Sequence, residues 1–221
     1  MTEQQAKTEA IALVDLDGTL ADFDSAMEQR LSVLRSPDEP SHPPEAGWKN
    51  LPDWLEARRT LVKSSPGFWT SLPRITDGFA VLEKIQQAGF ETHILTKGPF
   101  SSPNAWTEKV SWARANAPDI PITITEDKGL VYGRVLFDDW PPYINRWLEW
   151  RPRGLVVMLD QPWNQGFDHP NVFRYKQIRR SYEPALVAWK NKLGPRPEAL
   201  AAVMNTQDHE LWIRLIAAKS R

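Results

Sequence analysis

The chain has 221 residues, of which 41% are hydrophobic and 25% are charged, a mixture that is ordinary for a folded globular protein. The formal net charge is −1 and no long basic run is present, so no stable nucleic-acid partner is expected. Cysteine is absent, which excludes disulfides, thiolate zinc sites and cysteine nucleophiles.

The first predicted element is a buried strand from Ile11 to Val14, which ends at Asp15. A helix is predicted over 22–35, with an apolar face made of Phe23, Met27, Leu31 and Leu34. The proline-rich residues 36–47 are predicted to form a loop. A second helix is indicated by Trp54, Leu55, Arg58, Leu61 and Val62. We interpret 22–70 as a small helical cap inserted after the first strand.

Strands and helices alternate through the next part of the chain. In chain order, the pattern predicts a helix over 77–88, a strand over 91–95, a helix over 103–115, strands over 120–125 and 134–137, a helix over 142–150 and a strand over 155–159. Such alternation is typical of an α/β fold, in which a Rossmann-like parallel sheet carries helices on both faces.

The pattern weakens after Asp160, where 161–171 is predicted to form a loop. Three helices are predicted over 183–193, 197–204 and 207–219. We therefore divide the chain into a catalytic core (1–21 and 71–180), the cap (22–70) and a helical C-terminal extension (181–221). The extension could pack on the sheet or form a homodimer interface. Its apolar residues include Trp189, Leu193, Leu211, Trp212 and Leu215.

The N-terminal residues lack the basic-then-apolar pattern of a signal peptide. No apolar run approaches the length of about 18 residues that a membrane span requires. We expect a cytoplasmic protein with no membrane partner.

The clearest chemical motif is the run from Asp15 to Thr19, Asp-Leu-Asp-Gly-Thr, at the end of the first strand. Ligands of open α/β sheets bind beyond the carboxyl ends of the strands. Two carboxylates one residue apart could share a site there, one attacking and the other handling protons. Gly18 permits close approach of backbone N–H groups to a phosphate. The alternative interpretation is an acidic turn that only caps nearby N–H groups.

Three further groups follow other predicted strands. Thr96, Lys97 and Gly98 could bind phosphoryl oxygens, and Lys128 could neutralise a transferring phosphoryl group. Asp138 and Asp139 close the strand at 134–137 and suit a hard cation such as Mg²⁺. Each group alone is ordinary surface chemistry. Their order along four strand ends indicates one site.

This ordered series resembles the four motifs of the haloacid-dehalogenase superfamily of phosphotransferases, over residues 11–160. The resemblance implies an aspartyl-phosphate mechanism in which Asp15 is the nucleophile and Asp17 is the general acid and base. It implies that Thr96 and Lys128 hold the phosphoryl group. Its implied metal site binds Mg²⁺ through Asp15, the backbone carbonyl of Asp17 and Asp138, with Asp139 supporting these ligands.

Within the superfamily the chain is most similar to the 5'(3')-deoxyribonucleotidases. The similar stretches are 15–24, 68–73, 106–112 and 125–140. Two departures lie near the expected substrate, because Lys97-Gly98-Pro99 replaces the family's Ser-Pro and Trp140 replaces a basic residue.

The resemblance also implies that cap aromatics surround the base, and Phe23 matches such a position. Trp69 is a second candidate, as are Trp48, Trp54 and Phe68, although such rings can equally pack the cap onto the sheet. The expected activity is Mg²⁺-dependent hydrolysis of a nucleoside monophosphate. Alternatives are hydrolysis of another small phosphomonoester, such as a sugar phosphate or a nucleic-acid 3'-phosphate, and noncatalytic nucleotide binding.

Overall fold

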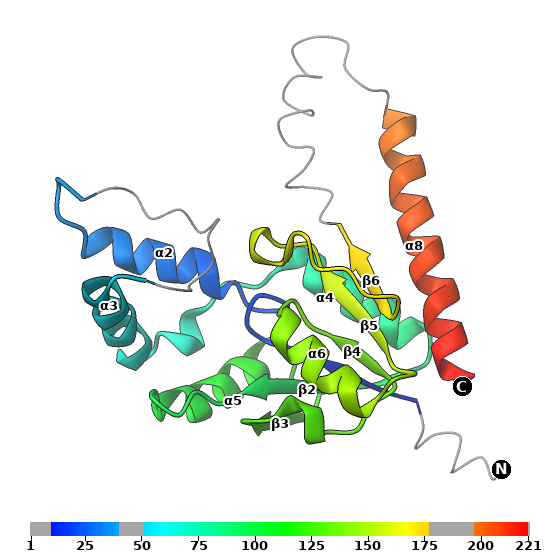
Figure 1. Cartoon of the computed structure of the whole chain (residues 1–221), viewed down its shortest axis with the longest axis horizontal. Helices are drawn as coiled ribbons and strands as arrows, with labels where there is room; N and C mark the ends of the chain where they lie inside the picture. Colours follow the sequence, from blue (N-terminus) through cyan, green and yellow to red (C-terminus); the bar gives the residue numbers. More distant parts are fainter. Residues whose placement is uncertain (1–9, 40–50, 177–196, 221) are drawn as a thin grey trace.

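The computed structural model describes residues 10–39, 51–176 and 197–220, with side chains in the last segment from Thr206 onward. Its described part contains one parallel sheet in the order β3-β2-β1-β4-β5-β6 (Figure 1). The strands are β1 (Ile11–Val14), β2 (Glu91–Lys97), β3 (Ile122–Thr125), β4 (Val135–Phe137), β5 (Leu155–Leu159) and β6 (Val172–Tyr175). This strand order confirms the predicted Rossmann-like α/β fold.

Helices cover both faces of the sheet because side chains along each strand alternate between two cores. The helices of the sheet domain are α4 (Thr76–Gln87), α5 (Asn104–Asn116), α6 (Pro141–Trp150) and α8 (Pro197–Lys219). Leu13 of β1 and Leu136 of β4 pack with Trp147 of α6 on one face. Val14 and Phe137 point to the other face, whose core includes residues of α4, α5 and α8.

The insertion after β1 contains α2 (Phe23–Val33) and α3 (Asp53–Ser64), which project to one side of the sheet in Figure 1. Asp22 caps α2 by accepting a hydrogen bond from the Ser25 backbone N–H at 3.1 Å. The chain returns through a short 3₁₀ helix, η2 (Trp69–Ser71). The predicted apolar faces need correction, since Leu34, Trp54 and Leu61 are exposed. Leu34 follows the end of α2, which explains why it misses the core.

Three other elements differ from their predictions. β2 continues through Thr96 and Lys97, which were expected to follow the strand. A sixth strand, β6, occupies residues for which no element was predicted. The helices predicted over 197–204 and 207–219 are one continuous helix, α8. The helix predicted over 183–193 lies outside the described residues, and the domain boundaries at 22, 71 and 181 stay a prediction.

The strand register sets the position of the site. Val14 at the end of β1 pairs with Ile94 of β2 and with Phe137 of β4. The residues that follow, Asp15 and Asp138, therefore emerge at the same level from adjacent strands. The chain crosses in opposite directions from β1, to β2 on one side and to β4 on the other, so this edge is the switch point where ligands bind in such sheets. None of the helices in the described segments combines the length and apolarity that a bilayer span requires.

Candidate active site

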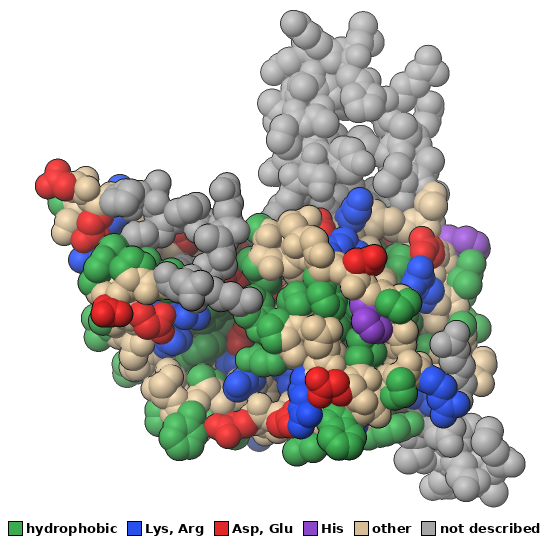
Figure 2. Space-filling view, viewed as in Figure 1, with side chains coloured by type: hydrophobic (Ala, Val, Ile, Leu, Met, Phe, Trp, Pro, Cys, Tyr) green, Lys and Arg blue, Asp and Glu red, His purple; other side chains and the backbone are tan. Residues whose placement is uncertain are grey.

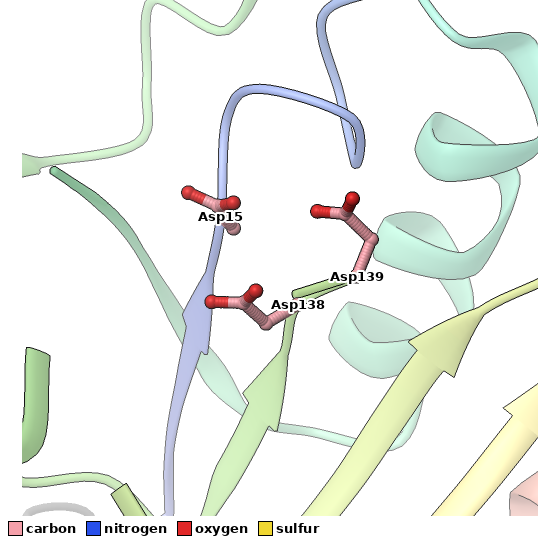
Figure 3. A group of neighbouring side chains, drawn as sticks. All are labelled: Asp15, Asp138 and Asp139. Carbon is pink, nitrogen blue, oxygen red and sulfur yellow. The ribbon is translucent and has the colours of Figure 1, made fainter. Parts of the chain in front are cut away.

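Three buried carboxylates meet at the switch point (Figure 3). Asp15 follows β1, and Asp138 and Asp139 follow β4; one oxygen from each lies within 4.8 Å of the others. Burial raises the pKa of Asp15 to about 7, with Lys128 opposing the rise and Asp138 adding to it. Burial also raises the pKa of Asp139 well above its usual range, and the charges of Asp138 and Asp15 add to this. An all-oxygen cluster that concentrates negative charge fits a divalent cation.

Lys128 lies between two of these carboxylates. Its Nζ atom is 2.6 Å from Asp15 Oδ1 and 2.7 Å from Asp138 Oδ2, and its side chain is buried. Burial alone would lower the pKa of Lys128, but the charges of Asp138 and Asp15 raise it above its ordinary value. The lysine starts a 3₁₀ helix, η3 (Lys128–Leu130), where Asp127 accepts a hydrogen bond from the Gly129 N–H at 2.8 Å. A permanent positive charge is therefore held beside the candidate nucleophile.

Asp17 is held by Lys109, a residue of α5 that sequence reasoning did not select. The buried Lys109 ammonium donates to Asp17 Oδ2 at 2.5 Å, to Thr96 Oγ1 at 3.1 Å and to the Lys97 carbonyl at 2.7 Å. Lys109 lies on the buried face of α5, in helical register with Ala105 and Ala113. A lysine on an otherwise apolar helix face was the available signal, because a buried ammonium requires acceptors.

The turn after β1 approaches Asp139 closely. Gly18 has φ +78°, and a Cβ atom there would lie 2.5 Å from Asp139 Oδ2. The Thr19 hydroxyl donates to Asp139 Oδ1 at 3.2 Å. Glycine is required here both by the backbone conformation and by the space beside the carboxylate.

A second support for Asp139 comes from the segment after β5, which includes the 3₁₀ helix η4 (Pro162–Asn164). Trp163 Nε1 donates to Asp139 Oδ2 at 2.7 Å, and Asn164 Nδ2 donates to the Asp139 carbonyl at 2.9 Å. Gln161 Nε2 donates to the Gly18 carbonyl at 2.8 Å. The sequence predicts only a loop for this segment, and no motif in it marks these contacts.

Arg174 of β6 holds this segment in place. Its guanidinium donates to Asp160 Oδ1 at 2.7 Å and to Asn164 Oδ1 at 2.6 Å. It also donates to the backbone carbonyls of Asn164 and Phe167 at 2.9 and 2.8 Å. The strand that was not predicted therefore fixes the residues that orient Asp139.

A pocket of about 770 Å³ opens beside the carboxylates, between the sheet edge and the projecting helices. Figure 2 shows basic side chains on both sides of the hollow between α2–α3 and the sheet. Phe23 and Trp69 line the pocket, with ring centroids 5.3 Å apart in a stacked arrangement. Lys97 also lines it, with Nζ 5.4 Å from the centre of the Tyr143 ring.

The structure thus brings together Asp15, Asp17, Lys128 and Asp139 around one pocket. Asp138 is fully buried and does not line the pocket, but one of its oxygens belongs to the cluster of three carboxylates and its Oδ2 contacts Lys128. Thr96 and Gly98 are not among the lining residues. The Thr96 hydroxyl contacts Lys109, and Gly98 lies directly against the Trp106 ring. Trp54 lies at the exposed surface beneath Arg58, and Trp48 is outside the described residues.

A parallel sheet of this order, with paired acids after β1 and β4 and a lysine between them, is that of a haloacid-dehalogenase-like phosphatase. Residues 9–183 match the family model described as "5' nucleotidase, deoxy (Pyrimidine), cytosolic type C protein", and the chain belongs to this family.

The individual proteins described next share 27% or less of their aligned residues with this chain. A protein from Bordetella bronchiseptica, provisionally named a 5'(3')-deoxyribonucleotidase, is 27% identical over 162 residues, which span 70% of this chain and 86% of that protein. A protein of the same name from Bordetella pertussis matches with the same figures. A HAD family hydrolase from Deinococcus radiodurans, solved with phosphate and sodium, has a TM-score of 0.48 and 14% identity, covering 82% of this chain and 96% of that one.

Proposed function

We propose that the protein is a Mg²⁺-dependent 5'(3')-deoxyribonucleotidase that removes phosphate from deoxynucleoside monophosphates. The observation that carries this proposal is one pocket that joins the carboxylate cluster to the stacked rings of Phe23 and Trp69. Base stacking on such rings contributes on the order of 1–3 kcal/mol. The volume of about 770 Å³ lies within the range of small-molecule sites and suits a nucleotide.

In the proposed reaction, Asp15 attacks phosphorus. A bond forms between one Asp15 carboxylate oxygen and phosphorus while the bond from phosphorus to the leaving oxygen breaks, and Asp17 donates a proton to that oxygen. Asp17 then accepts a proton from water, which attacks phosphorus and breaks the Asp15–phosphorus link, so phosphate is released and Asp15 is regenerated. Lys128 stabilises charge on the phosphoryl oxygens, and Lys109 keeps Asp17 in place for both proton transfers.

The carboxylates fit a magnesium ion. Asp15, Asp138 and the backbone carbonyl of Asp17 would hold it, with Asp139 in support, since the side chains offer only the oxygen donors that Mg²⁺ prefers. When bound, the ion neutralises charge on the phosphate and so makes attack by an anionic carboxylate feasible.

The test is a substrate panel with purified protein and Mg²⁺. The panel contains deoxyribo- and ribonucleoside 5'- and 3'-monophosphates, two sugar phosphates, an oligonucleotide 3'-phosphate and p-nitrophenyl phosphate. We expect deoxynucleotides to give the highest kcat/KM and Asp15→Asn to abolish turnover. Equal or faster hydrolysis of sugar phosphates would assign a different substrate class. Full activity of the Asp15→Asn variant would exclude Asp15 as the nucleophile.

A further inference from the structure

Two basic residues of the cap line the same pocket without a role in the steps above. Arg59 and Lys63 lie one helical turn apart on α3, and both face the pocket. Their side chains are 18% and 12% exposed, so both charges are largely withdrawn from solvent. Neither position belongs to a motif that the sequence suggested.

Glu56 contacts both cations. Glu56 Oε2 is 3.2 Å from Arg59 Nη1, and Glu56 Oε1 is 3.6 Å from Lys63 Nζ. The Glu56 side chain is 45% exposed, so solvent screens its attraction. Burial lowers the pKa of Lys63, and the charge of Arg59 lowers it further, while Glu56 opposes the change. Arg59 and Lys63 therefore place two basic groups at this part of the pocket.

Most of the acidic residues that line the pocket lie at the sheet edge and not on α3. Asp15, Asp17 and Asp139 stand at the sheet edge, and the charge of Asp24 acts on Asp139. Glu126 follows β3 at the same edge. An anion that entered near α3 would consequently meet the two cations.

The backbone of Lys63 has a fixed position relative to the stacked rings of Phe23 and Trp69. Its backbone carbonyl accepts hydrogen bonds from Trp69 Nε1 at 2.9 Å and from Asn104 Nδ2 of α5 at 3.2 Å. The backbone of α3 at Lys63 is thus tied both to Trp69 and to α5. A substrate that reaches from Asp15 along Phe23 and Trp69 extends towards α3.

We propose that Arg59 and Lys63 form a subsite for a second phosphate, so that the preferred substrate is a nucleoside 3',5'-bisphosphate rather than a monophosphate. This inference rests on the proposed nucleotidase activity. One phosphate occupies the site at Asp15 and Lys128, and the other, on the far side of the sugar, contacts the two cations. Arginine binds phosphate through paired N–H donors, and lysine adds a point charge.

The experiment compares thymidine 3',5'-bisphosphate with thymidine 5'- and 3'-monophosphate in the full-length protein with Mg²⁺. The readout is the ratio of kcat/KM for the bisphosphate to that for the better monophosphate. Both kcat/KM values in a ratio are measured on the same variant, so differences in the folded fraction between variants cancel. We expect a ratio of at least about 10 in the wild type, equivalent to about 1.4 kcal/mol. It should fall towards 1 in Arg59→Gln and Lys63→Gln and persist in Lys63→Arg.

Arg58→Gln is the matched control. Arg58 is the neighbour of Arg59 on α3, but it pairs with Glu39 and lies over the Trp54 ring outside the pocket lining. The control should retain the wild-type ratio. A wild-type ratio near 1, or an equal loss in Arg58→Gln, would overturn the subsite while leaving the nucleotidase activity intact.

A measurement of nucleotide binding tests the subsite independently of the proposed catalytic activity. If the wild type hydrolyses no phosphomonoester, the proposed function fails, and calorimetric titration with the same nucleotides then decides the subsite. Tighter binding of the bisphosphate that is lost in Lys63→Gln supports it, and equal affinities for bisphosphate and monophosphate reject it.

Discussion

Replacing Asp15 by asparagine should abolish turnover and make the metal-free protein more stable. Asparagine resembles the protonated carboxyl group in shape, so the substitution removes a negative charge without leaving a cavity. Lys128 does not become an unpaired buried cation, because Asp138 Oδ2 remains 2.7 Å from its Nζ atom. We expect a gain in stability because Asp15, Asp138 and Asp139 place three carboxylates close together in one buried space, where their negative charges repel.

The size of the gain follows from the pKa of Asp15, which burial raises from 3.8 to about 7, against the effect of Lys128. The folded protein binds this proton more tightly than the unfolded chain does. The free energy of unfolding therefore falls as the pH rises from about 4 to about 7, and this contribution is level above that. A shift of about 3 units corresponds to roughly 4 kcal/mol at pH 8. At pH 5 the difference is much smaller, because the folded-state carboxyl is still protonated.

Urea denaturation in EDTA at pH 5 and pH 8 measures both values. Asp119→Asn, at an exposed turn after α5, serves as the control for removing one carboxylate. We expect Asp15→Asn to be more stable than the wild type by several kcal/mol at pH 8 and by much less at pH 5. The reasoning is refuted if Asp15→Asn shows no gain at pH 8, or the same gain at both pH values. Mg²⁺ should stabilise the wild type more than the variant.

Three other substitutions test separate contacts. Lys109→Met leaves the Asp17 carboxylate without its ammonium, so kcat should fall by about 100-fold, with a smaller change in KM; an unchanged kcat in steady-state kinetics would remove Lys109 from the site. Gly18→Ala strains a positive-φ turn against Asp139 and should cost about 1–3 kcal/mol in urea denaturation; wild-type stability would contradict the packing. Trp163→Phe removes the N–H donor to Asp139 and should weaken Mg²⁺ binding by about tenfold in calorimetry, whereas unaltered affinity would make this hydrogen bond irrelevant to the metal.

The parallel sheet could be predicted because each buried strand is a compact apolar run followed by polar residues. Asp15 and Asp138 follow such runs, and parallel pairing places the carboxyl ends of adjacent strands at one edge. β6 was missed because Arg174 interrupts its apolar pattern. α8 was divided in two, although no Gly or Pro interrupts the residues between Pro197 and Lys219.

The missed site residues come from helices and loops, whose position in space does not follow from strand order. Lys109 could have been found from its place on the buried face of α5. Arg59 and Lys63 show no such signal, because basic residues on a helix are usually solvated. Trp163 contacts Asp139 from a segment whose position is set by hydrogen bonds from Arg174 of β6. No sequence pattern connects Arg174 with this segment.

The four hydrogen bonds from Arg174 to residues 160–167 have a thermodynamic consequence for cation capture. They immobilise Asn164 when the chain folds, and Asn164 in turn holds the backbone of Asp139. The conformational entropy of ordering this segment is therefore lost during folding and not at the binding step. An ion that bound at these carboxylates would therefore not have to order the segment at the binding step.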